Sequence, residues 1–214
     1  MKKQIINIYQ QLIKMYGHQQ DWWPGETPFH IAMGAILTQN TSWNSAYKAL
    51  QNLIQNKLDT PEKILNVPID KLRSLIKPAG FMNCKAIYLK NLASFICENL
   101  DCCILNLAKY ENPRKMLLSV KGIGKETADS ILLYAINLPY FVIDAYTIRL
   151  FSRLGLIKGK VSYDDLALLI TSQIPQDINL YKEFHALIVE HAKKRCKKQN
   201  PMCNSCLLKD LCLR

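Results

Sequence analysis

The stretch that decides the fold is "LLSVKGIGKETADSILLYA", residues 117–135, in which two glycines stand between two apolar segments. Apolar residues recur at helical spacing on both sides of "KGIG", so the stretch predicts a helix, a tight turn and a second helix. Gly122 and Gly124 allow positive φ and leave the backbone without side chains. The amides from Lys121 to Lys125 then stand at the start of a helix, where an anion such as a phosphate group can bind.

Helical spacing of apolar residues also dominates the rest of the chain. We count about ten helical segments and find no strong alternation of the kind that strands require. Thr60, followed by Pro61, predicts the start of one helix, and Asn40 or Thr41 is expected to cap the helix that follows "TQNTS". The sequence therefore predicts an all-α fold.

Composition limits the class of partner. The chain has 214 residues, 49% of them hydrophobic and 21% charged, with a net charge of +11. This balance is typical of a soluble globular protein, and its positive charge favours polyanions, nucleic acid before anionic membrane. No apolar run is long enough to cross a membrane, and the N-terminus is not a convincing signal peptide. We therefore expect a cytoplasmic protein that does not bind membranes.

Four cysteines in the last 19 residues have the spacing C-x6-C-x2-C-x5-C. This spacing is typical of a metal site, and both structural zinc and an iron–sulfur cluster accept four thiolates. Spacing alone does not separate the two metals. The ligands are expected to be Cys196, Cys203, Cys206 and Cys212. The other four cysteines, Cys84, Cys97, Cys102 and Cys103, lack such spacing and are expected to be ordinary core or surface thiols.

Asp144 follows the hairpin by some twenty residues, in "FVIDAYTIRL". It precedes a helix, so in isolation a helix N-cap is the simpler interpretation. Together, "VKGIGKETA", the "VID" aspartate and the cysteine tail resemble the endonuclease III branch of the helix–hairpin–helix DNA glycosylases, over nearly the whole chain. The resemblance makes Asp144 the catalytic residue that stabilises the sugar cation formed as a base leaves, or that orients the attacking water.

The resemblance also implies the architecture. It predicts a six-helix domain over residues 25–136 that carries the hairpin, and a discontinuous domain of residues 1–24 and 137–214 with a [4Fe–4S] cluster. Double-stranded DNA that contains a damaged base would bind in the cleft between the two domains. A glycosylase of this family is expected to be a nucleoid-associated monomer. The expected DNA contacts are Gln39, Phe81, Lys121, Gly122, Ile123, Gly124 and Lys125. Gln39 and Phe81 stand where family members insert wedge residues, although Phe81 fits a core aromatic equally well.

One position departs from the bifunctional members of the family. Those enzymes carry the lysine that attacks the sugar where this chain has Glu126, and Lys125 is rotated from that position by about 100° on a helix. The sequence therefore predicts a monofunctional glycosylase, without AP lyase activity. A bifunctional enzyme that acts on oxidised pyrimidines is the alternative, and a non-enzymatic binder of DNA structures is a third.

The base pocket is predicted from "WWPGE", "AILTQNTSW" and "GIGKETAD", which together are similar to the 3-methyladenine DNA glycosylase III subgroup. The resemblance places Trp22, Trp23, Pro24, Trp43 and Glu126 in the pocket. Electron-rich indoles favour a cationic, methylated purine by cation–π attraction. Simple packing of the two tryptophans is the alternative, and at least one of them is expected to stack on the base.

Overall fold

The computed structural model describes residues 2–19, 22–23 and 25–213, and these residues form helices without strands. The all-α prediction is confirmed. The chain divides into two compact units, one of residues 23–138 (unit 2) and one of residues 1–22 and 139–214 (unit 1). The sequence-based division placed these boundaries two residues away. Within the described residues, no helix combines the length and the apolar character that crossing a bilayer requires.

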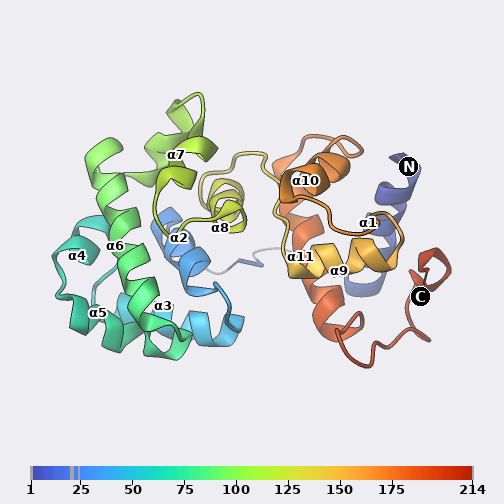
Figure 1. The fold of residues 1–214 in the computed structure, drawn as a ribbon, viewed down its shortest axis with the longest axis horizontal. Helices are drawn as coiled ribbons and strands as arrows, with labels where there is room; N and C mark the ends of the chain where they lie inside the picture. Colours follow the sequence, from blue (N-terminus) through green and yellow to red (C-terminus); the bar gives the residue numbers. More distant parts are fainter. Residues whose placement is uncertain (1, 20–21, 24, 214) are drawn as a thin grey trace. The chain divides into compact units, whose positions relative to one another are not determined.

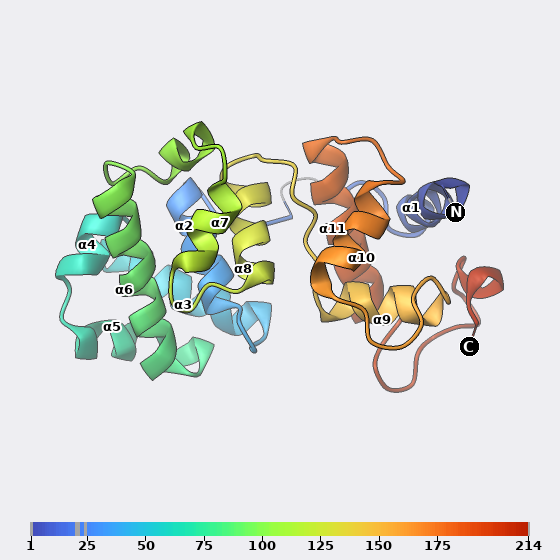
Figure 2. The ribbon, with the colours of Figure 1, turned by 45° about the horizontal axis from the view of Figure 1, so that its top comes forward.

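Unit 2 contains most of the helices (Figures 1 and 2). The long helix α6 packs against α4 and α5, and α2 packs against α3 and η3. The elements are α2 (Pro28–Leu37), α3 (Trp43–Gln55), α4 (Pro61–Asn66), α5 (Ile69–Ile76), η1 (Lys77–Ala79), α6 (Met82–Asn99), η2 (Ile104–Lys109), α7 (Pro113–Ser119), α8 (Lys125–Ser130) and η3 (Ile131–Ala135). Of these, η1 and η2 are 3₁₀ turns, whereas η3 is a π-helical segment that continues α8.

Unit 1 joins the first segment of the chain to its last third. Its first helix packs against α11, which also packs against α9. The elements are α1 (Lys2–Tyr16), α9 (Ala145–Arg153), α10 (Tyr163–Thr171), α11 (Ile178–Lys194) and the 3₁₀ turn η4 (Lys209–Leu211). Near the middle of α11, Phe184 is fully buried and contacts the rings of Tyr9 and Phe141 edge-on.

Side-chain caps explain where several helices begin. Thr27 accepts a hydrogen bond from the His30 amide at the start of α2, and Thr60 does the same for α4, as predicted. The predicted cap of α3 was wrong. Ser42 caps this helix, not Asn40 or Thr41, because its hydroxyl is the one that accepts from the Ser45 amide.

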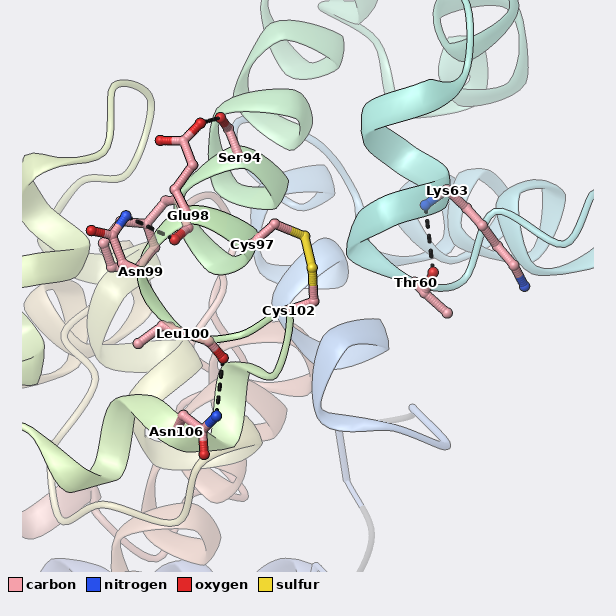
Figure 3. The surroundings of a disulfide bond; sticks show 10 residues. Thr60, Lys63, Ser94, Cys97, Glu98, Asn99, Leu100, Cys102 and Asn106 are labelled. Carbon is pink, nitrogen blue, oxygen red and sulfur yellow. Dashed lines mark hydrogen bonds between the residues drawn. A yellow bond between two sulfur atoms is a disulfide. The ribbon is translucent and has the colours of Figure 1, made fainter.

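Two further expectations were wrong, one about the backbone of Gly124 and one about two of the cysteines outside the tail. Gly124 has φ −90°, an ordinary value, so only Gly122 of the hairpin pair uses positive φ. Cys97 and Cys102 are not separate thiols, because a disulfide joins them at the end of α6 (Figure 3). The turn after this helix brings their α-carbons within 3.8 Å, a proximity that spacing alone did not reveal.

Candidate active site and DNA-contact residues

Asp144 is held in one orientation at the start of α9. Its Oδ1 accepts hydrogen bonds from the Thr147 amide at 2.7 Å and from the Thr147 hydroxyl at 2.8 Å. The aspartate is therefore a helix N-cap, and it is also buried, with 8% of its surface exposed. Burial by itself raises the pKa of this carboxyl, but the His185 ring and the Thr147 donors outweigh burial and lower it below its usual value. The result is a buried carboxylate that stays ionised at neutral pH.

His185 lies beside Asp144 and was not among the residues predicted from the sequence. It projects from α11 and places its Nε2 3.6 Å from Oδ2 of Asp144. The Trp22 ring meets the His185 ring edge-on, with 5.5 Å between the ring centres. The available signal was a histidine on the apolar face of a helix, and that signal alone does not reveal its partner.

Trp23 belongs to an aromatic cluster in unit 2, which we define as Trp23, Trp43 and Tyr134. The ring centres of Trp23 and Trp43 are 5.4 Å apart at an interplanar angle of 67°, and those of Trp23 and Tyr134 are 4.8 Å apart at 32°. Gly34 of α2 lies next to both indoles, since a Cβ placed there would be 3.5 Å from Trp23 and 3.9 Å from Trp43. Tyr134 was not predicted, because its position depends on the π-helical segment. Pro24 lies outside the described residues.

The hairpin is built around Gly122. Its φ is +102°, and a side chain there would put a Cβ 2.2 Å from the Tyr88 ring. Asn91 of α6 supports the same turn by donating a 2.9 Å hydrogen bond to the Lys121 carbonyl. Ile123 is buried, whereas Lys121 and Lys125 are exposed. The hairpin thus presents a rigid backbone flanked by two lysines.

Gln39 is attached to this hairpin. Its Nε2 donates hydrogen bonds to the Gly122 carbonyl at 2.9 Å and to the Thr127 hydroxyl at 3.0 Å. Gln39 follows the end of α2, so the amide links the α2–α3 turn to the start of α8. The residue predicted as a wedge therefore also contacts the predicted phosphate-binding turn.

Phe81 and Glu126 are both exposed. Phe81 is 65% exposed, with φ +47°, at the start of α6. The core-aromatic interpretation of Phe81 is therefore excluded. Glu126 lies in the first turn of α8, directly after Lys125, and both side chains reach solvent.

The four tail cysteines are free thiols that line one cavity in unit 1. Burial raises the pKa of the Cys206 thiol, and the charges of the other three add to this effect. Among the described residues, no three of the tail sulfurs lie within 4.8 Å of one another, but Cys206 is close enough to the other three for their negative charges to act on it. A multivalent cation bound by the four deprotonated thiols would offset this repulsion.

Two arginines of α9 hold the tail around this cavity. Arg149 donates to the carbonyls of Cys196 and Ala192, and Arg153 donates to the Cys196 sulfur at 3.1 Å. The Arg153 carbonyl in turn accepts from the Leu213 amide. These contacts fix the cysteine loop to the rest of unit 1.

Comparison with known proteins identifies the fold and the chemistry. Residues 33–176 match the model of the HhH-GPD superfamily of base excision DNA repair proteins. The chain belongs to this superfamily. It is a base excision repair DNA glycosylase of the HhH-GPD family, and it resembles endonuclease III.

Individual relatives cover nearly the whole glycosylase. A protein of Methanocaldococcus jannaschii with the provisional name of DNA repair glycosylase is 50% identical over 98% of this chain and 96% of its own length. Endonuclease III of Sulfolobus acidocaldarius is 32% identical over 86% of this chain and 81% of its own.

Two solved structures extend the comparison. A non-covalent endonuclease III–DNA complex has a TM-score of 0.87 at 22% identity, over all of this chain and 95% of the other, which shows a shared fold. The 3-methyladenine DNA glycosylase of H. pylori, bound to 1,N6-ethenoadenine, has a TM-score of 0.79 at 31% identity. It covers 89% of this chain, and this chain covers 97% of it.

Proposed function

We propose that this glycosylase excises alkylated purines from double-stranded DNA, 3-methyladenine first among them, and leaves the strand intact. The observation that carries the proposal is the contact between Trp23 and Trp43 next to Gly34. Indole faces attract a cationic purine by cation–π interaction and by dispersion. The 31% identity to a 3-methyladenine glycosylase bound to a modified adenine supports the same substrate class.

In the proposed reaction the damaged base leaves and positive charge develops on the sugar. The ionised carboxylate of Asp144 stabilises that charge, and its Thr147 hydrogen bonds hold it in place before the reaction begins. A 3-methylated adenine already carries a positive charge and is a good leaving group. The pocket therefore needs no strong general acid.

Glu126 accounts for the absence of strand cleavage in this proposal. A Schiff-base mechanism needs an amine at the sugar carbon, and a carboxylate at this position supplies none. The second candidate is a bifunctional glycosylase for oxidised pyrimidines. It is favoured by the 32% identity to an endonuclease III and by Lys125, which is adjacent to Glu126 in the first turn of α8.

The DNA contacts are proposed to lie on the hairpin and on two exposed turns. Lys121, Gly122, Ile123, Gly124 and Lys125 would bind phosphate. Gln39 and Phe81 would occupy the space that the flipped base leaves, and the exposure of Phe81 suits this role. We propose that the protein acts as a monomer.

The tail is proposed to hold a [4Fe–4S] cluster through Cys196, Cys203, Cys206 and Cys212. Four free thiols around one cavity supply the donor set, and the arginine contacts from α9 keep the loop in place. The cluster would fix the basic tail as a structural element. Analysis of iron and sulfide content, together with the visible absorption spectrum, separates this cluster from zinc.

The proposal is tested with two duplexes, one methylated at adenine N3 and one that carries an oxidised pyrimidine. We expect release of the methylated base from the first duplex, without cleavage of the strand, and no release from the second. Cleavage of the second duplex, with a covalent adduct trapped by borohydride, would instead support the bifunctional candidate.

A further inference from the structure

A pair of cysteines far from the tail lies at the end of α6. Cys97 is in the last turn of the helix and Cys102 is in the turn that follows, and a disulfide joins them (Figure 3). Asp101 and Cys102 both have positive φ, 50° and 54°, so the chain turns sharply back toward the helix. The Cys102 amide also donates to the Ile96 carbonyl, which keeps this turn in place. The backbone therefore holds the two sulfurs together.

A third ligand comes from a different helix. A carboxylate oxygen of Glu62, in the first turn of α4, lies within 4.8 Å of both sulfur atoms, which are themselves that close to each other. Among the histidines, cysteines, aspartates and glutamates of the described residues, this is the one group of three whose ligand atoms all lie within that distance of one another. Once the disulfide is reduced, two thiolates and one carboxylate are donors that tetrahedral zinc accepts, with metal–ligand distances of about 2.0 to 2.3 Å.

The neighbouring charged groups leave this carboxylate available. Lys63, the next residue, is paired with Asp59 at 2.7 Å. Glu98, which follows Cys97, accepts a hydrogen bond from the Ser94 hydroxyl (Figure 3). Glu98 is thus a carboxylate beside the site that is not part of the three-ligand group.

We propose that Glu62, Cys97 and Cys102 form a second metal site, which binds a zinc-like divalent cation when the cysteines are reduced. A water molecule would complete the tetrahedron. The metal would connect α4 to the end of α6, whereas the disulfide connects α6 only to its own following turn. Oxidation therefore exchanges one cross-link for another and releases the ion.

A small-molecule disulfide can serve as the oxidant that converts the two zinc-bound thiolates into the Cys97–Cys102 disulfide. One zinc-bound thiolate attacks a sulfur of that disulfide and displaces a thiolate. The second cysteine thiolate then attacks the mixed disulfide, which forms the Cys97–Cys102 bond and displaces a second thiolate. The two displaced thiolates take up two protons, the oxidant gains two electrons, and Zn²⁺ is freed.

The test measures zinc bound by the full-length, cluster-loaded protein under anaerobic conditions, with a chromophoric chelator as competitor. We expect the reduced wild type to bind one more zinc per chain than the Cys97→Ser/Cys102→Ser variant. Treatment of the wild type with glutathione disulfide should remove that extra zinc. The tail cysteines are present in both proteins, so their contribution cancels in the difference.

Matched variants assign the ligands. Glu62→Gln should weaken zinc binding by about 10-fold or more. Even loss of a residue that only hydrogen-bonds to a metal ligand lowers metal affinity by about 10- to 100-fold. Glu98→Gln and Cys84→Ser should leave it unchanged. Cobalt bound at the site should give thiolate-to-metal charge-transfer absorption that the double variant lacks.

Equal zinc content in the reduced wild type and the double variant would overturn the proposal. An unchanged zinc content of the wild type before and after treatment with glutathione disulfide would overturn it as well, and this comparison needs no mutation, so it holds even if a variant folds poorly. Neither outcome bears on the glycosylase activity, because the site shares no residue with the proposed base pocket.

Discussion

The buried ammonium of Lys85 donates a 2.8 Å hydrogen bond to the carbonyl oxygen of Leu37, the last residue of α2. A second hydrogen bond, also 2.8 Å, goes to the Ala79 carbonyl at the end of η1. The Leu37 carbonyl lies two residues before Gln39, and the Ala79 carbonyl lies two residues before Phe81. One buried cation therefore fixes both turns that carry the proposed wedge residues.

Lys85→Met should destabilise the protein by about 2 kcal/mol or more, because two buried carbonyls lose their donor. Burial lowers the pKa of Lys85 from 10.5 to about 8. Between these two values the unfolded chain binds more protons than the folded one, so the Lys85 contribution to the free energy of unfolding rises with pH. Urea unfolding of both proteins at several pH values measures the difference. If the free energy of unfolding changed with pH in the same way in both proteins from pH 8 to about 10, this interpretation would be contradicted.

Asp144→Asn should reduce base release by about 100-fold or more, because the carboxylate charge is lost where positive charge develops. The amide oxygen can still accept from Thr147, so the cap at α9 and the thermal stability should largely persist. Single-turnover kinetics on methylated DNA, together with a melting curve, check both statements. Unchanged base release in this variant would mean that Asp144 is a helix cap only.

The two adjacent tryptophans should respond differently to substitution. Trp23→Ala removes the centre of the aromatic cluster and should slow release of 3-methyladenine by about 5- to 150-fold, which corresponds to 1–3 kcal/mol of stacking. Trp22→Ala removes a ring contact with His185 and should chiefly lower the melting temperature. Parallel measurements of base release and melting separate the two effects. A larger loss of base release in Trp22→Ala would reverse the assignment.

Gly122→Ala and Gly124→Ala form a matched pair in the hairpin. At Gly122 the added Cβ meets the Tyr88 ring and the backbone has positive φ, so we expect weaker DNA binding and lower stability. At Gly124 nothing lies within 4 Å of the added atom, so folding should be unaffected. Fluorescence anisotropy with labelled duplex DNA measures binding. Equal effects of the two substitutions would argue against the hairpin geometry.

Much of this organisation could be predicted from local sequence. Helical spacing and caps such as Thr60 are local properties, and they located most of the helices. The hairpin was recognised because its residues are close in sequence, whereas Asp144, which alone indicates a helix cap, was assigned through the family resemblance.

The contacts that were missed depend on tertiary folding. His185 meets Asp144 only when α11 packs against α9, and Lys85 meets Leu37 only when α6 packs against α2. The Cys97–Cys102 pair depends on positive φ at two consecutive residues, Asp101 and Cys102. Neither is a glycine, so the sequence does not indicate this turn. Tyr134 joins Trp23 through a π-helical segment that apolar periodicity does not distinguish from an α-helix.

The most direct test of the central claim follows one duplex that contains a single methylated adenine, with chromatography of the freed base and electrophoresis of the strand. The account predicts that wild-type protein frees 3-methyladenine and leaves the strand uncut until alkali is added. Lys125→Ala should weaken DNA binding but, at saturating protein, should also free the base without cutting the strand, and borohydride should trap no covalent adduct with either protein. Failure to free the base, or strand cleavage with a trapped adduct that Lys125→Ala abolishes, would contradict it.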